Sequence, residues 1–199
     1  LRIMAIQEEV FERTVNMLNG AVKKIEIGDP RFLKTDIGPV IDEDAKDMIN
    51  KHLKKNRKNI LSKTKIEKDL KGNYISPTII KIDELNDVKE EIFGPIIHVM
   101  KYKSTELEQL VNNINRLNYG LTLGIQSRID NTINYIFNNV KVGNVYINRN
   151  IVGAVVGVQP FGGRGLSGTG NKAGGPNYLI QFVNEKTFTY NTTAAGGNA

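Results

Sequence analysis

Runs of β-branched and apolar residues alternate with segments of helical spacing along this chain, and no other feature limits its fold as strongly. Strands are predicted at residues 1–6, 74–82, 92–102, 121–127 and 143–149. Helices are predicted between them, at residues 7–25, 42–59, 104–120 and 130–140. Strands that alternate with helices indicate an α/β fold, with a mainly parallel sheet covered by helices.

The predicted helix at residues 104–120 has the clearest periodicity, with Ser104 as its expected N-cap and Gly120 as its end. Its expected buried face consists of Leu107, Leu110, Val111, Ile114 and Leu117. The face expected in the first helix consists of Phe11, Val15, Leu18, Val22 and Ile25. The face expected in the last helix consists of Ile133, Ile136, Phe137 and Val140.

Residues 159–176, QPFGGRGLSGTGNKAGGP, hold seven glycines and include G-x-G-x-x-G at Gly163, Gly165 and Gly168. A dinucleotide fingerprint needs a strand directly before the first glycine and a helix at the last. The strand predicted at residues 143–149 ends well before Gly163, and Pro176 would interrupt a helix. We therefore predict a tightly turned loop, in which backbone approaches backbone or a ligand, and not a phosphate cradle.

The composition excludes several classes of protein. With 40% hydrophobic and 24% charged residues, the 199 residues can bury one good core. No apolar run reaches the roughly 18 residues of a membrane span, and no leader precedes the first strand, so a cytoplasmic, soluble protein is expected. Cysteine is absent and His52 and His98 are the only histidines, which argues against disulfides and a metal site.

The net charge of +6 comes from one segment. Residues 51–71 hold nine Lys or Arg against Glu67 and Asp69, a local balance of +7. Such a segment is either a solvated helix and loop or a surface for nucleic acid or an anionic membrane. It has no aromatic side chain on which bases could stack, which favours a solvated surface and no nucleic-acid partner.

The end of the chain, residues 178–193, alternates partly between apolar and polar side chains. This pattern predicts a strand without a sheet of its own. Such a strand would pair with a free sheet edge, either in this chain or in another subunit.

Two stretches resemble signature segments of the aldehyde dehydrogenase superfamily: KEEIFGPIIHVMKY (residues 89–102) and NVYINRNIVGAVVGVQPFGGRGLSGTGNKAGGP (residues 144–176). The second, followed by YNTTAAGGN, is similar to the L-glutamate γ-semialdehyde (1-pyrroline-5-carboxylate) dehydrogenase module of the bifunctional proline utilization A proteins. The resemblance covers essentially the whole chain in order. It implies the α/β fold of an aldehyde dehydrogenase catalytic domain, and NAD as the cofactor.

Within EEIFGP, the resemblance implies that Glu91 binds the hydroxyls of the nicotinamide ribose and that Phe93 packs beside the nicotinamide. A carboxylate can accept two hydrogen bonds from a ribose diol. From the residues alone, Glu90 and Glu91 would instead be a solvated acidic turn before a strand.

Within IVGAVVGVQPFGG, the resemblance implies a loop that anchors the substrate. Gly153 and Ala154 would donate backbone N–H groups to the α-carboxylate of L-glutamate γ-semialdehyde, since backbone donors can form an anion-binding nest. Phe161 would pack on the aliphatic chain of the substrate. Taken alone, Phe161 would be an ordinary core residue.

The enzyme that this resemblance implies oxidises L-glutamate γ-semialdehyde to L-glutamate with NAD, in proline catabolism. A cysteine thiolate attacks the aldehyde, a hydride passes to NAD, and water hydrolyses the thioester with general-base assistance. The resemblance implies that this cysteine lies just before LRIMAI. It implies that the general-base glutamate and the Rossmann domain lie further upstream, so the chain itself holds no catalytic residue.

On this reading, residues 1–180 form a catalytic domain that lacks its N-terminal part, and residues 181–199 form an oligomerisation strand and tail. The expected partners are the small-molecule substrate and either further copies of the chain or the missing half. The chain alone is expected to be inactive. Two alternatives remain: a non-catalytic remnant or association module, and a nucleic-acid binder acting through residues 51–71.

Overall fold

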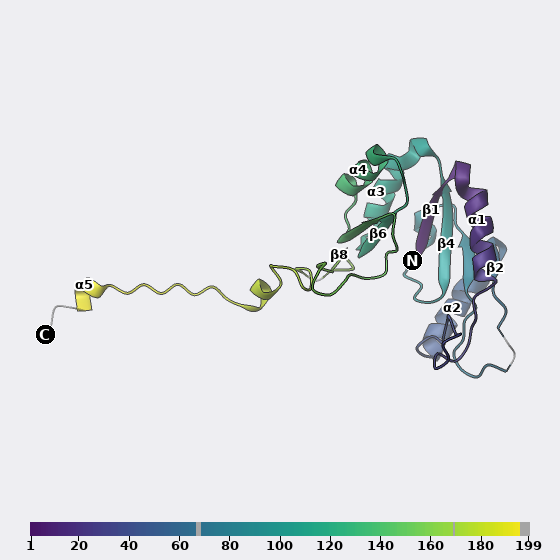
Figure 1. Ribbon diagram of the computed structural model, residues 1–199, viewed down its shortest axis with the longest axis horizontal. Coiled ribbons are helices and arrows are strands. Elements are labelled where there is room, and N and C mark those ends of the chain that lie inside the picture. The colour runs from purple at the N-terminus through teal and green to yellow at the C-terminus, as the bar shows by residue number, and fades with distance from the viewer. Residues whose placement is uncertain (67–68, 169, 196–199) are drawn as a thin grey trace. The chain divides into compact units, whose positions relative to one another are not determined.

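The computed structural model describes residues 1–66, 69–168 and 170–195. The chain divides into two compact units, unit 1 (residues 1–117) and unit 2 (residues 118–199), and each has its own strands and helices (Figure 1). Residues 67–68 of the basic segment, Thr169 of the glycine-rich stretch and residues 196–199 of the tail lie outside the described residues.

Unit 1 contains a four-stranded sheet in the order β1-β4-β3-β2. Its elements are β1 (Ile3–Gln7), α1 (Glu8–Val22), α2 (Glu43–Lys55), η1 (Arg57–Asn59), β2 (Ile60–Lys63), β3 (Thr78–Lys81), η2 (Leu85–Asp87), β4 (Ile96–Tyr102), η3 (Ser104–Glu106) and α3 (Leu107–Leu117). Strands β1 and β3 both pair with β4 in parallel, and β2 pairs with β3 antiparallel. The predicted α/β class is confirmed, but reading residues 51–71 as helix and loop was wrong at β2, a short strand among lysines.

Strands β3 and β4 bury side chains on both faces of this sheet, as strands of parallel sheets usually do. On one face, Ile79 and Val99 pack with side chains of β1 and α1. On the other face, Ile80, Ile96 and Met100 pack with side chains of α2 and α3. Because successive strand residues point to opposite faces, two neighbouring isoleucines of β3 serve two cores. The sheet therefore needs helices on both sides.

The helices of unit 1 begin where the sequence predicts, but α3 differs at both ends. The Asp42 side chain caps α2 by accepting a hydrogen bond from the Ala45 N–H at 2.8 Å. The predicted N-cap Ser104 instead lies inside η3, where the Lys103 N–H donates to the Glu106 carboxylate at 3.3 Å. The predicted end at Gly120 was also wrong, because the chain turns at Asn118, whose φ of 59° is left-handed.

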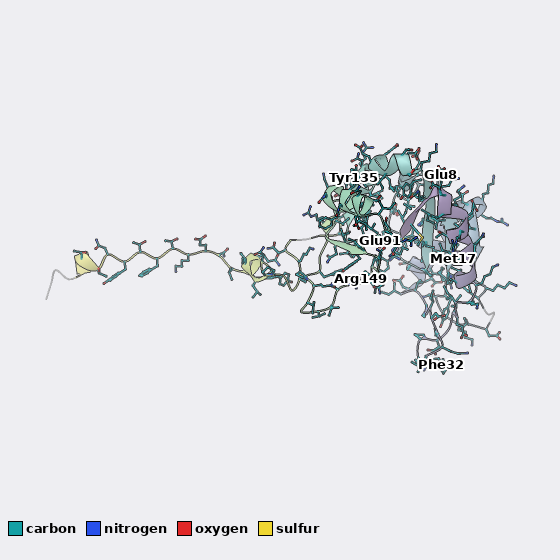
Figure 2. The ribbon with its side chains drawn as sticks, turned by 45° about the horizontal axis from the view of Figure 1, so that its top comes forward. Glu8, Met17, Phe32, Glu91, Tyr135 and Arg149 are labelled. Atoms are coloured by element: carbon teal, nitrogen blue, oxygen red, sulfur yellow. The ribbon has the colours of Figure 1, made fainter. Side chains whose placement is uncertain are left out.

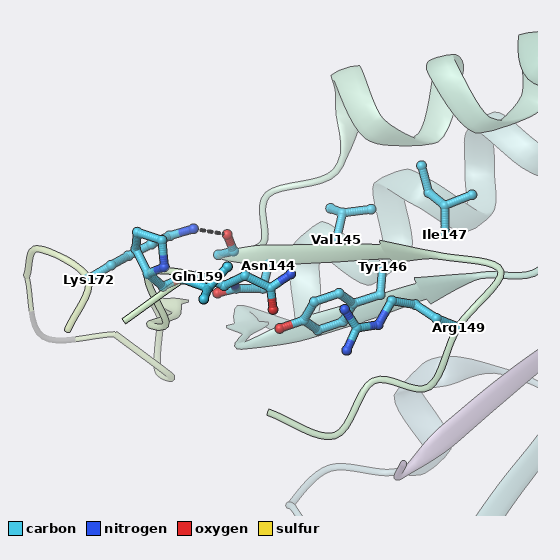
Figure 3. Close-up of a pocket in the computed structure, with 10 residues that line it drawn as sticks. Asn144, Val145, Tyr146, Ile147, Arg149, Gln159 and Lys172 are labelled. Carbon is cyan, nitrogen blue, oxygen red and sulfur yellow. Dashed lines mark hydrogen bonds between the residues drawn. The ribbon is translucent and has the colours of Figure 1, made fainter. Parts of the chain in front are cut away.

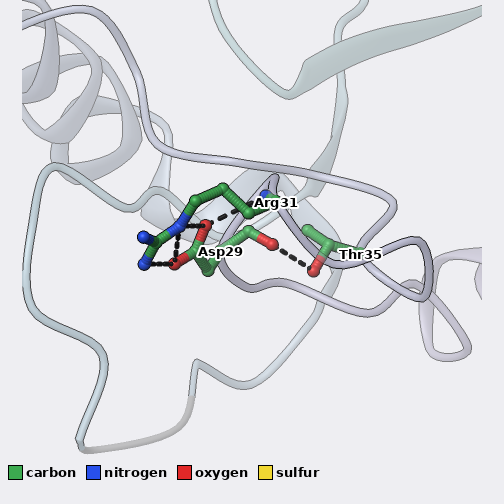
Figure 4. Close-up of polar contacts among 3 residues, drawn as sticks. All are labelled: Asp29, Arg31 and Thr35. Atoms are coloured by element: carbon green, nitrogen blue, oxygen red, sulfur yellow. Dashed lines mark hydrogen bonds and ion pairs between the residues drawn. The ribbon is translucent and has the colours of Figure 1, made fainter.

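The connection between α1 and α2 is held together by its own polar side chains (Figure 4). The Arg31 guanidinium donates to both carboxylate oxygens of Asp29, and the Thr35 hydroxyl donates to the Asp29 carbonyl at 2.8 Å. The Arg31 hydrogen bonds hold the pKa of the Asp29 carboxyl below its usual value. Phe32 lies exposed in this connection (Figure 2). These contacts shape an exposed loop and add nothing to the core.

Unit 2 is built from short elements. They are β5 (Tyr119–Gly120), β6 (Thr122–Ile125), α4 (Asp130–Asn139), β7 (Asn144–Ile147), β8 (Arg164–Gly165), η4 (Leu179–Phe182) and α5 (Thr192–Ala195). Strands β6 and β7 pair in parallel with α4 connecting them, and β5 pairs antiparallel with β8. Phe137 of α4 is 57% exposed, so its predicted place on the buried face was wrong.

The glycine-rich stretch is a tightly turned loop, as predicted. A side chain at Gly163 would collide with the Ser167 carbonyl, and one at Gly168 with the Gly163 carbonyl. The stretch is closed by two hydrogen bonds between the backbones of Phe161 and Ala173, both at 3.0 Å. The glycines therefore let backbone approach backbone within the loop.

The strand predicted near the end of the chain does not form among the described residues 183–190. Val183, Phe188 and Tyr190 are 68%, 83% and 63% exposed there. A strand needs a partner edge for its hydrogen bonds, so pairing with another chain stays a prediction. In the part of the chain that the structure describes, no helix has the length and apolar character needed to cross a membrane.

The two-faced burial of β3 predicts a large loss of stability for Ile79→Ala. Ile79 is 0% exposed, and the cavity left by an alanine should lower the free energy of unfolding by about 2–5 kcal/mol. The same substitution at Ile41, which is 92% exposed, is the matched control and should change it by less than about 0.5 kcal/mol. Urea unfolding followed by circular dichroism measures both, and equal effects would contradict the buried position of Ile79.

Candidate functional site

The predicted cofactor-binding residues flank a buried isoleucine directly before β4. Ile92 is 6% exposed and packs in the core between the sheet, α2 and α3. Glu91 and Phe93 on either side of it are exposed, the Glu91 side chain by 41% and Phe93 by 70%. A side chain at Gly94 would collide with Ile49 of α2, so the segment passes close against that helix. With Ile92 buried between them, the Glu91 carboxylate and the Phe93 ring both lie at the surface.

Arg2, directly before β1, contacts both of these residues. Its Nε donates to Glu91 Oε1 at 2.9 Å, and its guanidinium carbon lies 4.4 Å from the centre of the Phe93 ring. Its Nη1 also donates to the Gly94 carbonyl at 3.2 Å. One arginine therefore connects the acid, the ring and the backbone of the segment. No motif in the sequence points to Arg2.

Two histidines, His98 and His52, lie next to the backbone carbonyl of Arg2. The Arg2 carbonyl accepts a hydrogen bond from the His98 backbone N–H at 2.9 Å and lies 3.2 Å from His98 Nδ1. The Nε2 atoms of His98 and His52 are 2.8 Å apart. If His98 Nδ1–H donates to the carbonyl, its bare Nε2 accepts from His52, so two neutral rings satisfy both contacts.

Burial lowers the pKa of both histidines. For His52 the loss of hydration is the main cause, and the nearby Lys55 ammonium lowers the pKa further. For His98, which is 2% exposed, burial is again the main cause. The hydrogen bond to the Arg2 carbonyl raises the His98 pKa, and the charge of His52 lowers it. Both rings are therefore neutral near pH 7.

The predicted substrate loop in unit 2 has two adjacent backbone donors without an acceptor among the residues that the structure describes. The Val152 N–H donates to Asn150 Oδ1 at 3.3 Å, and the Val155 N–H donates to Gln159 Oε1 at 3.4 Å. Among the described residues, the N–H groups of Gly153 and Ala154 between them donate to no acceptor. Gly153 has a left-handed φ of 60°, and no atom lies within 4 Å of the place where a Cβ would be. Two adjacent donors of this kind can bind a carboxylate.

The backbone at Gly153 is held from β7. The Tyr146 hydroxyl donates to the Gly153 carbonyl at 2.7 Å, and the Arg149 guanidinium carbon lies 4.8 Å from the centre of the Tyr146 ring. Tyr146 itself is 5% exposed, so the hydroxyl is fixed from the core of unit 2. Tyr146 lies in a strand that the sequence predicts, but no sequence pattern indicates its contact with Gly153.

Phe161 is held at a different point of the same loop. The Asn144 Nδ2 donates to the Pro160 carbonyl at 3.0 Å, and Asn144 Oδ1 accepts from the Gly162 N–H at 3.3 Å. One asparagine thus fixes the residues on both sides of Phe161. The hydrogen bonds of the described residues join Phe161 to Ala173 rather than to Gly153 or Ala154.

A hollow of about 450 Å³ lies in unit 2 (Figure 3), and the described residues that line it include Asn144 and Pro160 but not Gly153, Ala154 or Phe161. Its lining includes Tyr146, Arg149, Gln159 and Lys172. The Lys172 ammonium donates to the Gly143 carbonyl, so that cation is already engaged. The predicted site residues lie in two groups: Glu91 and Phe93 in unit 1, and Gly153, Ala154 and Phe161 in unit 2.

Residues 1–188 of this chain match the sequence profile of the aldehyde dehydrogenase family. The chain belongs to the aldehyde dehydrogenase family. The bifunctional protein PutA of Klebsiella aerogenes is 47% identical over 194 residues, which cover 94% of this chain. The 1-pyrroline-5-carboxylate dehydrogenase of Geobacillus sp. is 37% identical over 185 residues, which cover 92%. The crystal structure of a mutant proline utilization A from Bradyrhizobium japonicum matches 98% of this chain with a TM-score of 0.92 and 46% identity.

The chain spans only a small part of these aldehyde dehydrogenase relatives. It covers 15% of the Klebsiella protein, 36% of the Geobacillus enzyme and 20% of the Bradyrhizobium chain. Membership of the family confirms the resemblance seen in the sequence, and it implies a nicotinamide dinucleotide as the oxidant. The roles of the individual site residues stay predictions.

The buried histidine pair predicts that the free energy of unfolding falls as the pH decreases. A histidine with a lowered folded-state pKa takes up its proton first in the unfolded chain, near the ordinary value of 6.5. The stability present above pH 6.5 should therefore decline as the pH drops towards the folded-state pKa values. Urea unfolding at several pH values from about 7.5 to 5.5 should show this decline, and it should be shallower in His98→Leu. An equal slope in both proteins would contradict the proposed titration.

Proposed function

We propose that this chain is part of a dehydrogenase that oxidises L-glutamate γ-semialdehyde to L-glutamate with NAD, in proline catabolism. The observation that carries the proposal is the pair of N–H groups at Gly153 and Ala154, which have no acceptor among the described residues and lie in a loop of a chain of the aldehyde dehydrogenase family. An aldehyde that also carries a carboxylate needs an anion site of this kind. The similarity to proteins named PutA and 1-pyrroline-5-carboxylate dehydrogenase supports this choice of substrate.

The cofactor contacts proposed for unit 1 fit a nicotinamide nucleoside. NAD would supply the hydride acceptor. The Glu91 side chain is 41% exposed, so its carboxylate can accept hydrogen bonds from a ribose diol. The exposed ring of Phe93 lies beside it and offers an apolar face that can shield the nicotinamide from water.

The proposed substrate contacts come from unit 2. The N–H groups of Gly153 and Ala154 would bind the α-carboxylate, and the ring of Phe161 would pack on the aliphatic chain. Exposed apolar side chains surround the two donors, with Val152 83% and Val156 96% exposed. Apolar surface around two donors would lower the local dielectric once it is covered, and would thereby strengthen the contact to the anion.

The proposal leaves the chemical step to residues outside this sequence. The 199 residues contain no cysteine, so an attacking thiolate has to come from elsewhere in the enzyme. In the same proposal, residues 1–180 belong to the catalytic domain and residues 181–199 join subunits. A cytoplasmic location and the absence of a nucleic-acid partner at residues 51–71 remain predictions from the sequence.

A chimera tests the proposed activity. The matching segment of the Klebsiella aerogenes PutA, 47% identical to this chain, is replaced by the 199 residues. NADH formation from L-glutamate γ-semialdehyde is then followed by absorbance. We expect turnover by the chimera and none by the 199-residue chain alone. The unmodified PutA assayed alongside gives the reference rate.

Two outcomes would overturn the proposal. A chimera that is folded by circular dichroism and has the assembly state of the host, yet forms no NADH, would exclude the proposed function. NADH formation by the isolated chain would show that the catalytic residues lie within it.

Phe161→Ala in the chimera tests the substrate contact. Loss of a ring packed on the substrate chain should raise KM for L-glutamate γ-semialdehyde by about ten-fold or more, while KM for NAD changes little. Phe137→Ala is the matched control, because Phe137 is 57% exposed on α4. If both variants keep the same substrate KM as the parent chimera, Phe161 is not a substrate contact.

A further inference from the structure

The topology of unit 1 brings two distant segments to one end of the sheet. Strands β1 and β4 are parallel neighbours, with Ile3 paired to His98. The residues that precede these two strands therefore meet at the same edge. Arg2 precedes β1, and Glu91 to Gly94 precede β4. This is why a side chain 89 positions away in sequence reaches Glu91.

We propose that Arg2 is a positioning residue that orients Glu91 and Phe93 for the ribose and nicotinamide of the dinucleotide. This inference rests on the proposed function. Arg2 makes three contacts with one short segment: a hydrogen bond to the Glu91 carboxylate, a hydrogen bond to the Gly94 carbonyl, and a cation–π contact with the Phe93 ring. The planar, forked guanidinium can make all three at once, whereas the ammonium of a lysine cannot.

Arg2 is itself fixed by the sheet. Its carbonyl accepts a hydrogen bond from the His98 backbone N–H, and His98 Nδ1 lies within 3.2 Å of the same oxygen. His98 is 2% exposed in β4. The arginine therefore extends from a rigid edge, which is what a residue needs in order to hold another side chain in a binding geometry.

The ion pair between Arg2 and Glu91 is too exposed to contribute much to the stability of the fold. The side chains of Arg2 and Glu91 are 35% and 41% exposed, and ion pairs of this kind change stability little because water and salt screen them. Holding Glu91 in one rotamer instead removes conformational freedom before a ligand binds. Its effect should therefore appear in the affinity for the dinucleotide.

The Arg2 contact leaves room for a ribose. Arg2 Nε donates one hydrogen bond to Glu91 Oε1. A carboxylate has about four acceptor positions on its two oxygens, so the others can accept from a ribose. Orientation by Arg2 predicts weaker binding of NAD when Arg2 is replaced. Competition between Arg2 and the ribose for Glu91 would predict the opposite, so the sign of the change distinguishes the two.

Calorimetric titration of the chimera with NAD and with ADP tests the inference. ADP lacks the nicotinamide ribose that Glu91 would bind, so it reports on the rest of the dinucleotide site. We expect Arg2→Met to raise the dissociation constant for NAD by about ten-fold or more and that for ADP by less than about two-fold. Arg31→Met, which removes an arginine from the exposed Asp29 pair, is the matched control and should change neither.

A second variant shows whether Arg2 acts through Glu91. Glu91→Gln alone should weaken NAD binding, and adding Arg2→Met to it should weaken binding by less than Arg2→Met does in the parent chimera. Arg2→Lys keeps the charge and should give an intermediate NAD affinity. If Arg2→Met does not fold, the NAD affinity of Arg2→Lys tests the inference instead.

The inference fails if Arg2→Met and Arg2→Lys bind NAD as tightly as the parent chimera, or more tightly. It also fails if ADP binding weakens as much as NAD binding, or if the effects of Arg2→Met and Glu91→Gln on NAD binding add in full. Because binding is measured without turnover, a chimera that binds NAD but oxidises no semialdehyde would reject the proposed function alone.

Discussion

The structure of unit 1 depends on strands β3 and β4, which are buried on both faces. Ile79 and Val99 on one side, and Ile80 and Met100 on the other, require α1 to cover one face and α2 with α3 to cover the opposite one. Parallel pairing of β1 with β4 then brings the residues before each strand to a common edge. The position of Glu91 and Phe93 beside Arg2 follows from this packing.

Periodicity in the sequence predicts the elements of this fold well because it reports directly on burial. The apolar face of α1 and most of α3 lie where the helical spacing places them. The predictions are wrong where the sequence pattern is short, or where two neighbouring residues could each end a helix. Strand β2 has four residues in a lysine-rich segment, and Asn118 ends the helix two residues before the more obvious Gly120.

The candidate site is predicted from the sequence only in part, because its geometry depends on long-range contacts. Motif resemblance points to Glu91, Phe93, Gly153, Ala154 and Phe161. Nothing in the local sequence points to Arg2 or Tyr146, whose contacts with Glu91 and with Gly153 are seen only once the chain is folded. The residues that support a site are thus harder to find than those that would touch a ligand, since their role is set by tertiary structure alone.

The close approach of Gly94 to Ile49 has a consequence for how such a site can change over time. A side chain at position 94 would push against α2, and Ile49 is fully buried in the same core as Ile92. The contact between Ile49 and Gly94 therefore connects α2 to the segment that carries Glu91 and Phe93. Under the proposed function, a substitution in α2 that moves Ile49 would alter dinucleotide binding through Gly94, while the side chains proposed to contact the ligand stay the same.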